Sequence, residues 1–247
     1  DGDGDGDGDG DSFDEWLLTS DDDGVGIVRL LRIDISEDEL GDITVICPDI
    51  EFPPEVMKNR FISMAFLDDT LYATRGNKLM IVDPCTCVAS FVGTLSGTVA
   101  GIAVNASDVM YGVNKDDNSL YEINPQDASM QLVATFDFDV GNHGLTWSNE
   151  LINELYFVEA NTDTLRVLDG SDPASEKSQV PLNLDFPGVG LEMHPGNEVL
   201  YTCAGTDELF TINIETGEVD LQAVFSDYMG GCSGLGAPWG PVGCIPE

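Results

Sequence analysis

The sequence is short of basic residues. It has nine Lys and Arg against 46 Asp and Glu, which gives a formal net charge of −37 over 247 residues. A surface with this charge repels the phosphates of nucleic acids and of anionic lipid headgroups, so both are excluded as partners. Runs of 18 apolar residues are also missing from the sequence, which excludes a transmembrane helix.

Residues that could support catalysis are scarce as well. The chain has two histidines, His143 and His194, and it lacks a Gly-x-Ser-x-Gly nucleophile elbow, a P-loop and a dinucleotide-binding fingerprint. We therefore expect a protein that is not an enzyme, with both histidines as ordinary loop residues. A calcium-dependent hydrolase that uses Asn142 and His143 at a channel mouth is the weakest alternative.

What the chain does contain is a repeat of about 45 residues. Four segments carry Leu-Tyr or Met-Tyr, and they begin 39, 45 and 45 residues apart. These segments are Leu71-Tyr72, Met110-Tyr111, Leu155-Tyr156 and Leu200-Tyr201. A small residue with a hydrophobic step precedes each one, and a Leu-x-x-apolar-Asp/Asn run follows it. Short strand-like segments with this period predict a β-propeller, with one four-stranded blade per repeat.

The two ends of the chain carry the two halves of one more repeat. Gly234 to Ala237 matches the first landmark, whereas Trp16 to Leu18 and Leu30 to Asp34 match the second and third. We therefore predict an all-β fold, a five-bladed β-propeller over residues 15–247. Residues around 234–245 would form the inner strand of the closing blade and residues around 15–47 its outer strands, which avoids an open edge.

The landmarks resemble the secreted NHL-like and YVTN-like β-propeller repeats, whose blades carry G-L-A, L-Y and I-D-P-x-T-G. The most similar segments are Gly101 to Ala103, Met110-Tyr111, Ile123 to Pro125 and Ile212 to Gly217. The resemblance covers most of residues 15–245 and implies a secreted propeller. It implies no single activity, because such propellers bind ligands, bind proteins or house enzymes.

Residues 1–14 form a separate acidic segment that begins with five Asp-Gly pairs. Asp supplies hard oxygen ligands and Gly lets backbone carbonyls approach an ion closely, a combination that suits Ca²⁺. From Asp3 onward the spacing resembles the calcium loops of thrombospondin type-3 and dockerin repeats. The predicted Ca²⁺ ligands are Asp1, Asp3, Asp5, Asp7, Asp9, Asp11 and Asp14. A solvated acidic linker is the alternative interpretation.

Six cysteines are present, an even number that favours disulfides in an oxidising compartment over a zinc site. Cys85 and Cys87 lie in a predicted turn, where they either close on each other or staple the loop. A bridge from Cys47 or Cys232 to Cys244 would lock the seam of the ring.

Other features allow both a structural and a functional interpretation. Trp147, Trp239 and Tyr156 would serve as inter-blade core or as a sugar-stacking platform. Three acidic groups lie in predicted hairpins that we expect to occupy equivalent places in their blades: Asp21 to Gly24, Asp68-Asp69 and Asp116-Asp117. Their carboxylates would either favour the turn or bind cations. Asn105 begins an Asn-Ala-Ser sequon in a predicted hairpin and is compatible with glycosylation.

These observations predict an extracellular, secreted structural protein, a subunit of a filament or surface layer. Residues 1–14 would bind Ca²⁺ or dock on a neighbouring subunit, and the chain would self-associate into a homo-oligomer or filament. A lectin-like, ligand-binding secreted propeller is the alternative. The sequence begins at Asp1 rather than at Met, which we interpret as a processed product or a chain known only from this point.

Overall fold

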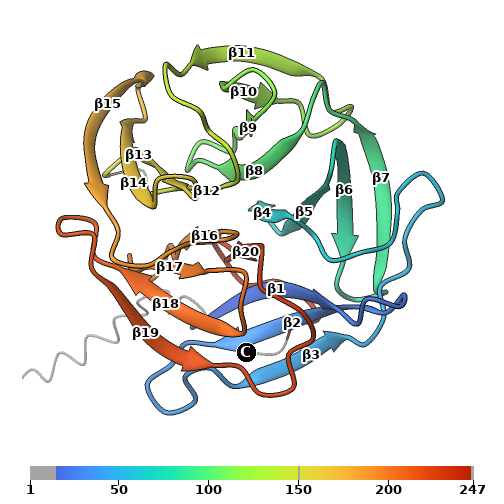
Figure 1. Cartoon of the computed structure of the whole chain (residues 1–247). Helices are drawn as coiled ribbons and strands as arrows, with labels where there is room; N and C mark the ends of the chain where they lie inside the picture. The colour runs from blue at the N-terminus through green and yellow to red at the C-terminus, as the bar shows by residue number, and fades with distance from the viewer. Residues whose placement is uncertain (1–14, 150, 246–247) are drawn as a thin grey trace, which may run out of the picture.

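The fold is the predicted five-bladed β-propeller. A computed structural model describes residues 15–149 and 151–245, which form five antiparallel four-stranded sheets arranged in a ring (Figure 1). No helix occurs among these residues, so none is long and apolar enough to cross a membrane.

Each blade is listed from its innermost to its outermost strand. The closing blade consists of β20 (Leu235–Gly236), β1 (Trp16–Asp22), β2 (Val28–Asp34) and β3 (Ile43–Cys47). The second blade consists of β4 (Ser63–Leu67), β5 (Thr70–Arg75), β6 (Lys78–Asp83) and β7 (Val88–Thr94). The third consists of β8 (Val99–Val104), β9 (Met110–Asn114), β10 (Ser119–Ile123) and β11 (Met130–Thr135). The fourth blade consists of β12 (His143–Trp147), β13 (Glu154–Glu159), β14 (Thr164–Asp169) and β15 (Asp172–Pro181). The fifth consists of β16 (Gly190–Met193), β17 (Leu200–Cys203), β18 (Glu208–Ile212) and β19 (Val219–Val224).

The repeated Leu-Tyr or Met-Tyr pair lies on the second strand of four blades. Its two side chains pack against different blades, one against the preceding blade and one against the following blade. In β13, Leu155 packs in the core shared with the preceding blade, whereas Tyr156 packs in the core shared with the following blade. Successive side chains of a strand point to opposite faces, so a blade covered on both sides needs two large apolar residues in sequence. This requirement explains why the pair recurs once per blade.

The predicted closing blade is also confirmed. Strand β20 pairs antiparallel with β1 through Leu18 opposite Gly236 and Thr19 opposite Leu235. One sheet therefore joins the two ends of the described chain and closes the ring, with β20 as its innermost strand.

The disulfides confirm that Cys85 and Cys87 staple their turn to other segments, but the bridges expected at the seam of the ring are not the ones that form. The bonds join Cys47 to Cys87, Cys85 to Cys244, and Cys203 to Cys232. Cys85 and Cys87 therefore do not close on each other, and Cys244 bonds to neither Cys47 nor Cys232. The Cys85–Cys244 bond fastens the segment after β20 to the turn between β6 and β7, because ring closure brings these distant segments together.

The ring has two faces that differ in their connections. We call the face where the innermost strands β4, β8, β12, β16 and β20 begin the upper face, and the face where they end the lower face. Strand β1 runs in the opposite direction to these innermost strands. Two contacts show this: Trp16, which begins β1, packs against Phe66 near the end of β4, and Asp22, which ends β1, contacts Arg60 just before β4. The described chain therefore starts at the lower face.

Candidate functional site

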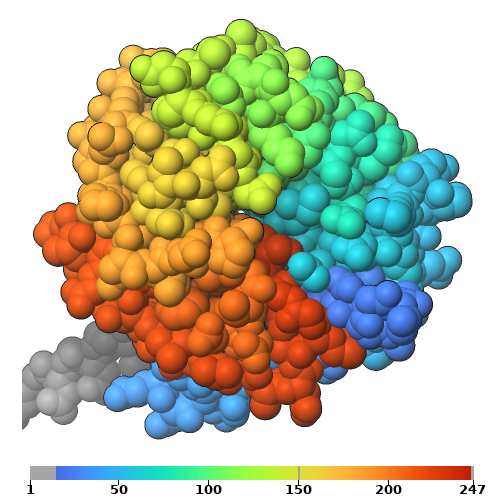
Figure 2. Space-filling model, viewed as in Figure 1, coloured from blue at the N-terminus to red at the C-terminus, as the bar shows by residue number. Residues whose placement is uncertain are grey.

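The centre of the ring is lined by the innermost strands and is almost filled. Figure 2 shows only a narrow depression there. Near the lower face the remaining cavity measures about 10 Å³, which is room for roughly one water molecule. Among the residues that line it are Ala65, Ala103, Thr146 and Glu192, which hold the third position of the first repeat landmark in four blades.

Glu192 is the acidic residue of this cavity. Its Oε1 accepts a hydrogen bond from the backbone N–H of Ala237 at 3.2 Å, and its Oε2 accepts one from Oγ1 of Thr146 at 3.3 Å. Burial raises the pKa of Glu192 well above its usual range, and both hydrogen bonds oppose that rise. The side chain ties β16 to β12 and to the residue after β20, which gives it a structural role at the centre of the ring.

The sequence reasoning missed Glu192. A signal was present, because alignment of the landmarks places an acid where two other blades have Ala65 and Ala103. The side chain at that position faces the channel, so an acid that stands alone among small residues there indicates a polar contact at the centre of the ring.

Both histidines are buried: His143 begins β12 rather than lying in a loop, whereas His194 lies in the connection between β16 and β17, as expected. His143 stacks on Phe157 with ring centroids 4.9 Å apart, and it lies against Gly101 of the preceding blade. Burial lowers the pKa of His143 to about 4, although backbone hydrogen bonds, including one to Gly141, oppose the change. His194 is also buried, and its Nδ1 accepts a hydrogen bond from the N–H of Gly196 at 3.2 Å.

The hydrolase alternative gains no support from the surroundings of His143. Asn142 is exposed, and its carbonyl accepts the N–H of Ala160 at 3.0 Å. Over residues 15–149 and 151–245, no group of three or more His, Cys, Asp or Glu side chains is placed to hold a metal ion.

Two of the three aromatic residues considered for sugar stacking belong to the core. Trp147 stacks on Tyr111 with ring centroids 4.7 Å apart, and its Nε1 donates to Asn153 at 3.2 Å. Tyr156 is buried and donates its hydroxyl to Glu154 at 2.9 Å. Only Trp239, beside the channel cavity, keeps a partly exposed side chain. The structural interpretation therefore holds for Trp147 and Tyr156.

The acidic hairpins fall on different faces. Asp68-Asp69 joins β4 to β5 at the lower face, whereas Asp116-Asp117 joins β9 to β10 at the upper face, so the two are not equivalent as expected. Asp21 and Asp22 belong to β1 itself and are buried in ion pairs. Asn105 lies in the predicted hairpin, where its Oδ1 accepts the N–H of Ser107 at 3.0 Å.

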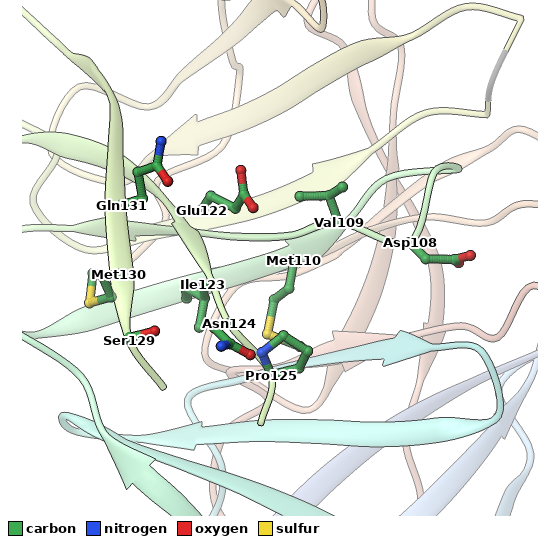
Figure 3. A pocket seen from close by; sticks show the side chains of 10 residues that line it. All are labelled: Asp108, Val109, Met110, Glu122, Ile123, Asn124, Pro125, Ser129, Met130 and Gln131. Atoms are coloured by element: carbon green, nitrogen blue, oxygen red, sulfur yellow. The ribbon is translucent and has the colours of Figure 1, made fainter. Parts of the chain in front are cut away.

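The lower face also carries an open hollow of about 510 Å³ beside β9, β10 and β11 (Figure 3). Asp108 and Glu122 supply its carboxylates, and Met110 and Met130 lie among its apolar side chains. In the view of Figure 3, Val109 lies between the two carboxylates and Asp108 points away from Glu122. The hollow combines two carboxylates with apolar side chains, so its surface is of mixed character.

The predicted Ca²⁺ ligands Asp1 to Asp14 lie outside the described residues. Calcium binding by this segment therefore stays a prediction.

Comparisons with known proteins support the fold. No family model matches the chain, and no curated protein matches it. The chain is similar to a chain in the crystal structure of a nidogen/laminin complex, with a TM-score of 0.58 and 12% identity over 90% of this chain and 97% of that one. It is also similar to a structural genomics protein of unknown function from Bacteroides thetaiotaomicron VPI-5482, with a TM-score of 0.52, 14% identity and coverage of 88%. The chain spans 60% of the length of the latter. At these identities the likeness shows the propeller fold alone.

Proposed function

We propose that the protein is a secreted, non-enzymatic structural propeller that self-associates, and that its residues 1–14 bind Ca²⁺ or dock on a neighbouring copy. The observation that carries this proposal is the apolar rim of the ring. The rim consists of the outermost strands β3, β7, β11, β15 and β19, each of which is the edge of its sheet.

Four of these edge strands expose large apolar side chains. The exposed fraction is 44% for Val45, 56% for Leu132, 53% for Leu221 and 59% for Val224, and Phe91 is 37% exposed. An edge strand presents unpaired N–H and C=O groups, and apolar side chains on it favour pairing with another chain. The same feature on β3, β7, β11 and β19 supports lateral contact between copies.

The net charge opposes such contact. At −37, two copies repel each other unless cations reduce the charge between them. A divalent cation that binds carboxylates would lower this repulsion, and the seven Asp residues of segment 1–14 are suited to hold it. Assembly that depends on calcium is therefore the form of self-association that the composition favours.

The disulfides support an extracellular location for this role. All six cysteines are paired, and disulfides persist in oxidising compartments outside the cytosol. The Cys85–Cys244 bond also fastens the closing blade, which suits a subunit that bears load in an assembly.

Electron microscopy and light scattering of the full chain with and without Ca²⁺ test the proposal. We expect lateral oligomers with Ca²⁺, their loss on chelation, and loss of assembly without unfolding when residues 1–14 are deleted. Leu132→Asp on β11 should weaken lateral contacts, whereas Thr135→Asp, which adds the same charge on the same strand, serves as its control. Monomers in every condition would contradict the proposal.

A further inference from the structure

The few basic residues are distributed unevenly between the faces. In the described residues, the lower-face connections between strands contain no Lys or Arg. Six of the nine basic residues lie in upper-face connections or at the strand ends next to them: Arg29, Lys58, Arg60, Arg75, Lys78 and Lys115. The described chain starts at the opposite, lower face. The two faces are therefore electrostatically different, which matters for how two copies would meet.

Arg75 differs from the other arginines on the upper face. It ends β5, beside Thr74, which pairs with Ser63 at the start of β4. Among the described residues its guanidinium makes no ion pair and no hydrogen bond, and its Nε is buried without a partner. In a chain with 46 acidic side chains, an arginine without a carboxylate partner is unexpected.

Arg60 lies near Arg75, because the N–H of Ile62 donates to the carbonyl of Thr74 at 2.9 Å and so brings their two segments together. The Nη1 of Arg60 contacts Asp22 at 3.1 Å and its Nε donates to the Oγ of Ser233 at 3.3 Å, while a third of its side chain stays exposed. Burial lowers the pKa of Arg75, and the charge of Arg60 lowers it further, whereas Asp22 acts in the opposite direction. Asp22 is paired with Arg60, and no carboxylate among the described residues is paired with Arg75, which leaves the charge of Arg75 uncompensated.

A carboxylate is the ligand that this pair lacks. A guanidinium donates two parallel hydrogen bonds to a carboxylate, and such charge-assisted pairs are about twice as strong as neutral hydrogen bonds. We propose that Arg75 and Arg60 form a carboxylate-binding site on the upper face, and that its occupant is the Asp-Gly segment 1–14 of a second copy of the chain.

The place where segment 1–14 joins the propeller favours a second copy as the donor. The segment continues into β1 at the lower face, whereas the arginine pair lies at the upper face. Fourteen residues reach at most about 50 Å when fully extended, enough to pass from one ring to a ring stacked on it. Because donor and acceptor lie on opposite faces, the contact is head-to-tail, and copies stacked face to face through it would form a filament.

This inference rests on the proposed self-association and makes it specific. It also separates the two roles proposed for the segment, because a carboxylate that binds Ca²⁺ is not free to bind arginine. Docking on Arg75 should persist or strengthen when Ca²⁺ is chelated, whereas assembly held together by calcium should be lost.

Binding of a labelled, N-acetylated peptide of residues 1–14 to the full-length chain tests the site by fluorescence anisotropy. We expect binding that weakens with salt, a loss of about tenfold or more in Arg75→Gln, and a smaller loss in Arg75→Lys. Lys115→Gln removes the same charge from the same face and should change the affinity less than threefold. A peptide with Asn in place of every Asp should not bind.

The outcomes test whether the arginine site binds the segment, independently of whether the chain assembles as proposed. Absence of peptide binding, or equal losses in Arg75→Gln and Lys115→Gln, overturns the site even if the chain assembles with Ca²⁺. Selective loss in Arg75→Gln supports the site even if the full chain stays monomeric. Thermal unfolding of each variant shows whether it is folded, and Arg75→Lys keeps the test decisive if Arg75→Gln is not.

Discussion

Replacing Asp21 with Ala should cost much of the stability of the closing blade. Asp21 is completely buried and accepts hydrogen bonds from the guanidinium of Arg29 and from the N–H of Met229, the latter at 2.8 Å. It therefore joins β1, β2 and the connection that leads to β20. Removing one partner of a buried ion pair leaves the other charge uncompensated, which costs about 3–5 kcal/mol.

Asp49→Ala is the matched control, because Asp49 pairs with Lys58 at 2.6 Å but is 52% exposed. Exposed pairs contribute only about 0.2–1 kcal/mol. The assay is equilibrium unfolding in urea with the disulfides intact. Asp21→Ala combined with Arg29→Met should recover part of the loss, because neither charge is then left unpaired. If Asp21→Ala and Asp49→Ala lower the free energy of unfolding equally, burial of the pair is not what stabilises this blade.

Two further predictions concern the disulfides and the pH dependence of stability. Mild reduction should open Cys85–Cys244 before the fully buried Cys203–Cys232. Loss of the Cys85–Cys244 bond should lower the free energy of unfolding by about 5 kcal/mol, because that bond closes a loop of 159 residues. Alkylation with mass spectrometry measures the order, urea unfolding measures the loss of stability, and earlier reduction of the buried bond would contradict the predicted order. Since His143 has a folded pKa of about 4 against 6.5 when unfolded, the unfolded chain binds the proton first, so stability should fall by about 3 kcal/mol as pH drops from 6.5 to 4. In His143→Phe this part of the pH dependence should be absent from urea midpoints, and an unchanged slope would refute the assignment.

The positions of the strands were predictable because the signals for them are local. Leu155 and Tyr156 are adjacent, and each must be large and apolar because a blade is covered on both sides. The same pair recurs once per blade, so its spacing indicates the number of blades. The closing blade followed from the half-repeats at Trp16 and Leu235, since neither half can bury its faces alone.

The site residues were less predictable. The environment of His143 depends on Gly101 and Phe157, which come from a neighbouring blade and a neighbouring strand, and no short sequence window contains that packing. Glu192 carried a signal in the aligned landmarks. Its hydrogen bond from Ala237, however, depends on how β16 and the end of the chain meet across the channel.

The sequence alone therefore determined the fold class, the number of blades and the composition of the closing blade, because each follows from a pattern within one repeat. Only the tertiary structure decided which cysteines bond and which charges meet. Asp22, Arg60 and Ser233 are far apart in the chain and come together at the seam where the ring closes. Sequence spacing carries no information about such contacts, because the closure of the ring sets them.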